Sequence, residues 1–182
     1  MICNMKWLFF SYSLPTSPSK ARVFVWRQLK KLGTINYQSI WVVPRSNERI
    51  AELKKLIEDI EGFKGTGLLI SGTILSQGHE EQIINAFIDS RNEEYVEFID
   101  KCEAFFKEIE FEINRENLIF AEVEENEEEL GKLKQWLKKI EKRDVIKPPL
   151  HKEATAKLKR CEKLFDNFAR IVYEYNQSTN RK

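Results

Sequence analysis

The stretch KWLFFSYSLPTSPSKARVFVWRQLKKLG, residues 6–33, decides the fold of the amino-terminal half. Its first part, Lys6–Ser13, is a short run of aromatic and aliphatic side chains, which predicts a β-strand. Leu14-Pro15 ends that strand. A helix is predicted from Ser17, as its N-cap, and Pro18 to Leu32, with Gly33 suited to the helix end. One face of this helix is apolar at helical spacing, through Val25, Leu29 and Leu32.

The next forty residues add four more elements. Two short strand-like runs, Thr34–Gln38 and Ile40–Val43, predict a tight hairpin. A helix over Glu48–Ile60, capped by Ser46 or Asn47, and a last strand over Gly67–Ser71 follow. The predicted order is β-α-β-β-α-β, which is typical of a ferredoxin-like domain over residues 1–75.

From residue 76 onward the apolar period becomes helical. The sequence predicts helices over Glu80–Glu112, which Ser90–Asn92 could bend or break, over Phe120–Arg143, and from near His151 to the polar tail. The first of these carries an apolar stripe of Ile84, Ile88, Tyr95, Phe98, Cys102, Phe106 and Ile109. The last carries a seven-residue repeat of Ala154, Leu158, Cys161, Phe165, Phe168, Val172 and Tyr175. Helices joined by short links predict an antiparallel helical bundle over residues 76–182, and an α+β chain overall.

Charge is distributed unevenly along the chain. No Asp or Glu precedes Glu48, and residues 1–75 carry 11 basic and 5 acidic side chains, against 19 and 24 in the remainder. Such a division favours a polyanionic partner for the amino-terminal half. We therefore predict nucleic-acid contacts at the basic residues Lys20, Arg22, Arg27, Lys30, Lys31 and Arg45. The alternative is an ordinary solvated basic helix face.

Aromatic residues in the same half also allow two interpretations. They could stack on bases between the basic residues, or they could belong to the core, which is the more common role of strand and helix aromatics. The residues concerned are Trp7, Trp26, Tyr37 and Trp41.

The remaining polar clusters carry no catalytic signature. The acidic run Glu122–Glu129 lacks the residue pattern of a calcium loop, and it is more typical of the charged first turns of a helix. Arg91 is a candidate oxyanion ligand or a partner in ordinary ion pairs along its helix. We predict no metal site, no cofactor and no enzymatic activity. The chain has no apolar run long enough to span a membrane, and we expect a cytoplasmic protein.

Three segments resemble one known family. WLFFSYSLPTSPSKARVFVWRQLKKLG with INYQSIWVVP resembles the amino-terminal part of the chromate-resistance regulator ChrB. RNEEYVEF and FAEVEENEEELGKLKQWLKKIEKRD are similar to the helical region of that family. The first segment also resembles, more distantly, the central domain of the phenylacetate repressor PaaX and the small ferredoxin-like nucleases of CRISPR adaptation.

The resemblance implies a transcription regulator of a chromate-efflux operon, with this region binding double-stranded DNA. It places the basic residues of the family on Lys20, Arg22, Arg27, Lys30 and Lys31. The acidic residue that the nucleases carry at the end of the first strand is absent from Ser11–Leu14, which argues against cleavage. The alternative hypothesis is an oxyanion-sensing or protein-interaction module without DNA binding, in which Arg91 and one or more of Lys20, Arg22 and Arg27 bind an oxyanion between the two predicted domains. An open ferredoxin-like sheet further predicts a homodimer.

Overall fold

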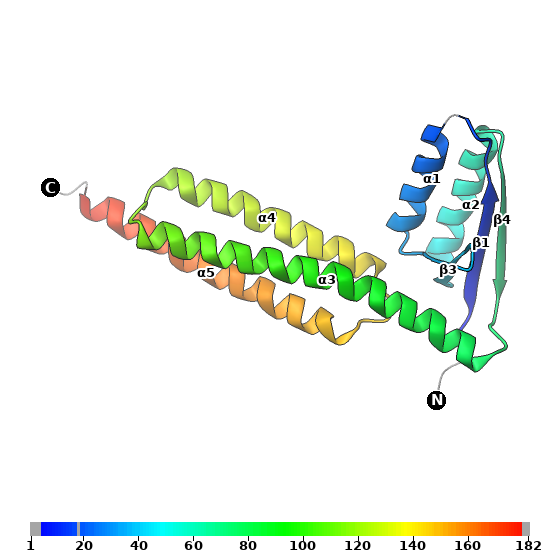
Figure 1. Cartoon of the computed structure of the whole chain (residues 1–182). Helices are drawn as coiled ribbons and strands as arrows, with labels where there is room; N and C mark the ends of the chain where they lie inside the picture. Colours follow the sequence, from blue (N-terminus) through cyan, green and yellow to red (C-terminus); the bar gives the residue numbers. More distant parts are fainter. Residues whose placement is uncertain (1–4, 18, 180–182) are drawn as a thin grey trace. The chain divides into compact units, whose positions relative to one another are not determined.

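The computed structural model describes residues 5–17 and 19–179, so Pro18 of the predicted helix start lies outside the described residues. Within them the chain is an α+β protein, mostly helical, with one four-stranded sheet and five helices (Figure 1). The elements follow in the order β1 (Trp7–Ser13), α1 (Ser19–Lys31), β2 (Ile35–Tyr37), β3 (Ile40–Pro44), α2 (Asn47–Gly62), β4 (Thr66–Gly72), α3 (Gln77–Asn114), α4 (Phe120–Arg143) and α5 (Pro149–Thr179).

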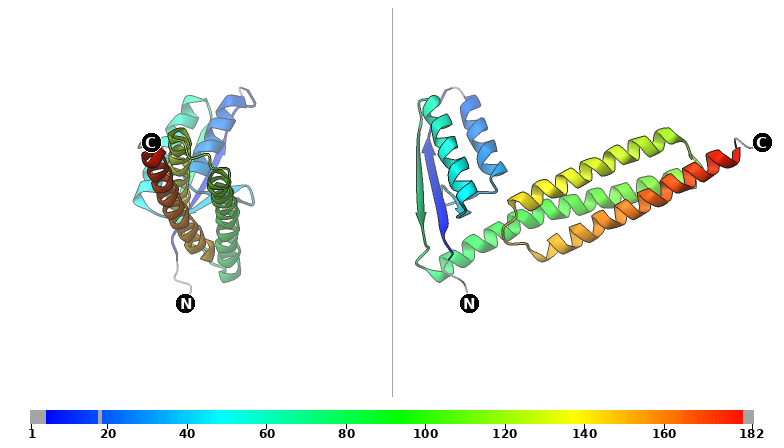
Figure 2. Two further views of the ribbon diagram at one scale, coloured as in Figure 1. Left: turned by 90° about the vertical axis from the view of Figure 1, so that its left-hand side faces the viewer. Right: turned by 180° about the vertical axis from the view of Figure 1, so that it is seen from behind.

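The sheet has the strand order β2-β3-β1-β4, and every neighbouring pair is antiparallel. Phe10 at its centre stands opposite Trp41 of β3 and Leu69 of β4. Both α1 and α2 lie against one side of the sheet (Figure 2). Gly67 allows the close approach of α2, because a Cβ there would lie 2.8 Å from Cγ1 of Ile57. The core of this layer is therefore formed between the helices and the side of the sheet that carries Phe10.

The β2–β3 connection is a two-residue turn. Tyr37 pairs with Ile40, and the residues between them, Gln38 and Ser39, have φ angles of 47° and 68°. Two successive positive φ values are typical of a type I′ turn, whose twist matches that of the strands it joins. The turn thereby fixes the position of Ser39 relative to the end of β1.

The chain divides into two compact units. The first unit comprises the chain up to Ser90 together with Arg143–Ile146, and the second comprises Arg91–Lys142 together with the chain from Lys147 onward. The predicted boundary stood at residue 75, whereas this division falls within α3. The return of Arg143–Ile146 to the first unit depends on Gly33, where φ is +75° and a Cβ would lie 2.8 Å from the carbonyl oxygen of Arg143.

The first turns of α3 belong to the core of the first unit. Trp7 donates a hydrogen bond from Nε1 to Oε1 of Glu80 over 2.8 Å, and its ring stacks on Phe87 with centroids 5.8 Å apart. The predicted stripe was wrong by one position here, because Ile83 and Phe87 are the buried residues while Ile84 and Ile88 are only half-buried. Because α3 packs in two different cores, its buried apolar residues do not continue along one straight stripe of the helix.

The second unit is formed by the rest of α3 with α4 and α5, which lie side by side (Figures 1 and 2). The helix continues through Ser90–Asn92 without a break. The core of the second unit includes the free thiols Cys102 and Cys161. Tyr175, predicted to lie on the core face of α5, is 47% exposed. The neighbouring Asn176 turns inward instead and donates to the carbonyl oxygen of Leu118 over 2.8 Å, since α-helical periodicity drifts from a strict seven-residue repeat.

Candidate nucleic-acid interface

Helix α1 has one buried and one exposed side. Ala21, Val25 and Leu29, spaced four residues apart, are buried in the core of the first unit. The helix ends with Lys30 and Lys31 and has no acidic residue in its first turn. Burial of the apolar side holds the helix rigidly on the sheet, because each buried aliphatic side chain contributes roughly 1.5–3 kcal/mol.

Five of the predicted contact residues are exposed on α1, and we call them together the basic face: Lys20, Arg22, Arg27, Lys30 and Lys31. Helical spacing places Lys20, Arg27, Lys30 and Lys31 on one side of the helix and Arg22 on another, closer to the buried Leu29. Within the described part of the chain, none of them lies within ion-pair distance of a carboxylate. Their charge is therefore available to an external anion. An ordinary solvated helix instead interleaves charges of both signs.

The sixth predicted residue, Arg45, comes from a different element. It is exposed, and it directly follows β3, where its backbone N–H donates to the carbonyl oxygen of Lys6 over 2.9 Å. The structure thus gathers five of the six residues on one helix and places the sixth at the end of a strand.

An exposed tryptophan interrupts the basic face. Trp26 is 49% exposed, Val23 is 44% exposed, and the Nζ atom of Lys30 lies 6.0 Å from the centroid of the Trp26 ring. Of the four aromatics considered for stacking, the structure buries Trp7 and Trp41. The half-buried Tyr37 donates its hydroxyl to Gln82 over 2.6 Å. Trp26 is therefore the most exposed of the four.

The basic face ends at a groove between α1 and α2. This groove, of about 480 Å³, is lined by Lys31 and, from α2, by Glu52, Lys55 and Asp59. The two carboxylates lower the local positive potential at Lys31 relative to the rest of the face. The strongest positive field is expected around Lys20, Arg27 and Lys30.

Comparison with known protein families identifies the family of the chain. The family described as "Protein ChrB, N-terminal" matches residues 22–179. The chain belongs to the ChrB N-terminal family. The match covers most of the chain, including Arg22 to Lys31 of α1, and it relates the protein to chromate resistance. It confirms the resemblance inferred from the sequence. No curated protein and no solved structure matched the chain.

Arg91, the candidate oxyanion ligand of this ChrB-family chain, is 3% exposed and belongs to the second unit. Its Nη1 atom forms an ion pair with Oε1 of Glu94 over 2.9 Å, one turn further along α3. A carboxylate bound directly to the guanidinium offsets the positive charge that an oxyanion would need. The geometry therefore favours the basic face over Arg91 as the anion-binding surface.

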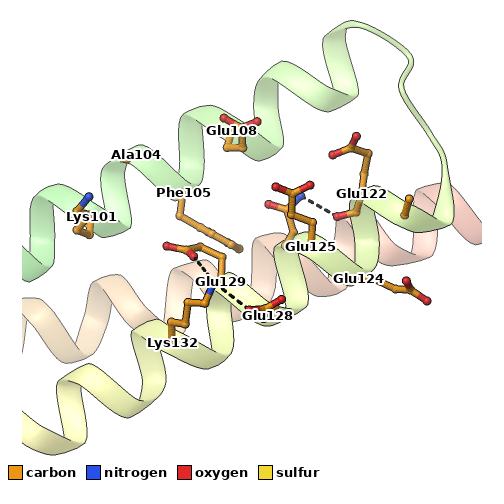
Figure 3. Close-up of a pocket in the computed structure, with 12 residues that line it drawn as sticks. Lys101, Ala104, Phe105, Glu108, Glu122, Glu124, Glu125, Glu128, Glu129 and Lys132 are labelled. Carbon is orange, nitrogen blue, oxygen red and sulfur yellow. Dashed lines mark hydrogen bonds and ion pairs between the residues drawn. The ribbon is translucent and has the colours of Figure 1, made fainter.

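The second unit carries a hollow of opposite charge. A groove of about 670 Å³ between α3 and α4 is lined mainly by carboxylates, including Glu108 of α3 and Glu125 of α4 (Figure 3). Lys132 forms ion pairs there with Glu128 and Glu129 over 3.0 and 3.5 Å. The acidic run thus lies on the first turns of α4, as expected. No group of three or more His, Cys, Asp or Glu residues in residues 5–17 and 19–179 could hold a metal ion.

Among the described residues, no helix is both long and apolar enough to cross a lipid bilayer.

Proposed function

We propose that the protein is a DNA-binding transcription regulator, or an accessory protein of such a regulator, in chromate resistance. The observation that supports this most directly is the basic face of α1, whose five cations are exposed and lie beyond ion-pair distance of any described carboxylate. Membership in the ChrB N-terminal family is consistent with this role.

The physical basis is neutralisation of phosphates. Each phosphate neutralised by Lys or Arg releases counterions, so affinity falls as salt rises, with a slope of about −0.9 per contact on a log–log scale. The 13 residues of α1 give a helix of about 20 Å, which is long enough to cross several phosphates. The exposed side chains of Val23 and Trp26 would then meet sugar or base edges between the phosphate contacts.

We assign the first unit to the ferredoxin-like class and the second to the antiparallel bundles. The element order β1-α1-β2-β3-α2-β4 and the all-antiparallel sheet support the first assignment. The three long helices α3, α4 and α5 support the second. The sheet would serve as the rigid base that holds α1.

The test is a salt series of DNA binding followed by fluorescence anisotropy. A labelled duplex of about 30 base pairs is titrated between about 50 and 200 mM salt, and we expect a slope near −4 for four to five contacts. The variant Lys20→Gln/Arg27→Gln/Lys30→Gln/Lys31→Gln should lose at least ~100-fold in affinity at the lower salt concentration, and its slope should shrink to about −1, for the contact that Arg22 can still make.

The matched control removes the same charge from the second unit. Lys132→Gln/Lys134→Gln/Lys157→Gln/Arg170→Gln neutralises four cations that already have carboxylate partners. It should bind DNA like the parent protein. Equal losses in the two variants, or binding that is indifferent to salt, would contradict the proposal, as would the absence of binding at low salt.

We further propose that two copies pair through β4. This edge strand has seven residues, TGLLISG, without a charged side chain, and it exposes Leu68 to 57% and Ile70 to 50%. Natural edge strands are protected by charges, prolines or bulges, so an uncharged edge of this length favours pairing. A second copy fits because an antiparallel edge is self-complementary about a two-fold axis.

Sedimentation velocity tests the pairing. Ile70→Lys should convert a dimer to a monomer, whereas Val96→Lys should leave the dimer intact, because Val96 is similarly exposed but lies on α3 in the second unit. A parent protein that is monomeric at high micromolar concentration would rule out the β4 dimer.

A further inference from the structure

A second feature of the first unit lies beside the basic face. A hollow of about 470 Å³ opens between the end of β1, the β2–β3 turn and α1. It falls within the range of about 300–1,000 Å³ that is usual for sites of small organic ligands. It is also far larger than a single tetrahedral oxyanion would need, since a water molecule takes about 30 Å³ of liquid volume.

The lining combines donors with aromatic surface. Arg22 supplies the only charge among the described residues that line the hollow. Asn36 and Ser39 contribute an amide and a hydroxyl from β2 and its turn, and Ser13 contributes a hydroxyl from the end of β1. The half-buried Tyr12 supplies a ring, and Trp41, which is 8% exposed, adds a small apolar surface beside it. A ligand with an anionic group and a flat aromatic group matches this set.

Arg22 is held in place by the chain itself. Its Nη2 atom donates to the backbone carbonyl oxygen of Thr16, which ties the guanidinium to the segment that precedes α1. A guanidinium carries five N–H donors, so several remain to bind an anion in its fork geometry. Arg22 thereby differs from Lys30, which lies on the same helix but does not line the hollow.

Tyr12 is positioned by its neighbour on β1. Its ring lies against Phe10 with centroids 6.0 Å apart. Its hydroxyl can donate to a base edge or to a phosphate. The type I′ turn fixes Ser39 on the opposite rim.

We propose that this hollow binds a nucleoside 5′-phosphate, with the phosphate at Arg22 and the base against Tyr12 and Trp41. The inference stands on the hollow alone and does not require that α1 binds duplex DNA. Two sources share this chemistry: a free mononucleotide and the 5′-phosphorylated end of a single strand.

Isothermal titration with deoxyadenosine 5′-monophosphate tests the site. The nucleotide should bind at least ~10-fold more tightly than deoxyadenosine or inorganic phosphate, because only the nucleotide engages both parts of the lining. Arg22→Gln should remove that advantage and leave deoxyadenosine binding unchanged, and Arg22→Lys should restore it only in part. Asn36→Ala should weaken the binding of the nucleotide but not the binding of inorganic phosphate.

Lys54→Gln is the matched control, since it removes one positive charge from an exposed position of α2 in the same unit, outside the hollow. It should leave nucleotide binding intact, and the thermal unfolding of each variant is recorded to confirm folding. Equal losses in Arg22→Gln and Lys54→Gln, or a nucleotide no better than phosphate, would overturn the proposal.

Single strands of about 12 nucleotides, with and without a 5′-phosphate, distinguish the two sources. A preference for the phosphorylated strand that Arg22→Gln abolishes assigns the site to strand ends. Equal binding of the two strands, together with tight binding of the mononucleotide, assigns it to free nucleotide. The α1 variant with four neutral residues retains Arg22, so a failure of duplex binding can be separated from a failure of this site.

Discussion

The cations of α1 and those of the second unit differ in what faces them. In the second unit Lys134 pairs with Glu162 over 3.0 Å, Arg170 pairs with Glu174 over 3.2 Å, and Lys157 pairs with Glu103. On α1 the five cations of the basic face have no such carboxylate within the described residues. Some cations of the second unit are thus committed to internal ion pairs, whereas the five on α1 are not.

This difference explains why net charge alone is a weak guide to function. The whole chain has a formal net charge of only +1. Exposed ion pairs of the second unit contribute little to stability, roughly 0–1 kcal/mol each. The cations that lack partners are those from which an external anion can gain the most.

The largest effect is expected from disrupting the support of the basic face. Val25→Glu places a carboxylate at a position that is 0% exposed and should cost more than ~3 kcal/mol of unfolding free energy. Val23→Glu introduces the same side chain two residues earlier, where the position is 44% exposed, and should change stability by less than ~0.5 kcal/mol. Urea denaturation of both variants tests whether α1 depends on its buried side.

The next variant gives the basic face a partner of the kind found in the second unit. Val23→Glu adds a carboxylate four residues before Arg27 and three residues after Lys20. It should weaken duplex binding by about 10-fold and reduce the magnitude of the salt slope by about 1 to 2. Val23→Gln has a similar size without charge and should bind DNA nearly as the parent does. Indistinguishable anisotropy curves for the two variants would contradict the idea that DNA binding depends on the absence of carboxylates from the basic face.

A smaller effect is expected at Trp26. Trp26→Ala removes the exposed ring and should weaken DNA binding about 5-fold, because stacking or apolar contact by an aromatic side chain contributes about 1 kcal/mol or more. Its melting temperature should remain close to that of the parent, since the ring is half exposed. Tyr173→Ala, at an exposed aromatic of the second unit, is the control and should leave binding unchanged.

The smallest effect concerns an ion pair of the second unit. A hydrogen bond from Lys157 lowers the pKa of Glu103 below its usual value of 4.5. A lowered pKa in the folded state adds stability above the unfolded pKa, and this stability is lost as the pH falls through the folded pKa. Glu103→Gln should therefore lower the urea midpoint slightly near neutral pH, and the deficit should shrink as the pH falls below the usual carboxyl range. A deficit that persists at low pH would show that the pair acts through packing.

The local elements were predictable where one core determines the pattern. The strand over Lys6–Ser13 and the end of α1 at Gly33 follow from short-range chemistry, and the structure places β1 at Trp7–Ser13 and a positive φ at Gly33. The stripe through Ile84 was displaced because the first turns of α3 pack in one unit and the remaining turns in another.

The site was predictable only in part. The exposure of the α1 cations follows from their position relative to Val25 and Leu29 on one helix. The hollow beside Arg22 depends on the position of the β2–β3 turn relative to the end of β1, which is a tertiary property. A positive φ at Gln38 and at Ser39 also had no sequence signal, since neither residue is Gly or Asn.

The return of Arg143–Ile146 to the first unit has a consequence for biosynthesis. The sheet, α1 and α2 are all translated before Ser90, yet the tetrapeptide that completes their unit emerges only after α4 has been made. At about 5–20 residues per second, the nascent chain would wait roughly 3 to 11 seconds for those last residues. During that interval Gly33 lacks the backbone of Arg143 that packs against it in the complete unit.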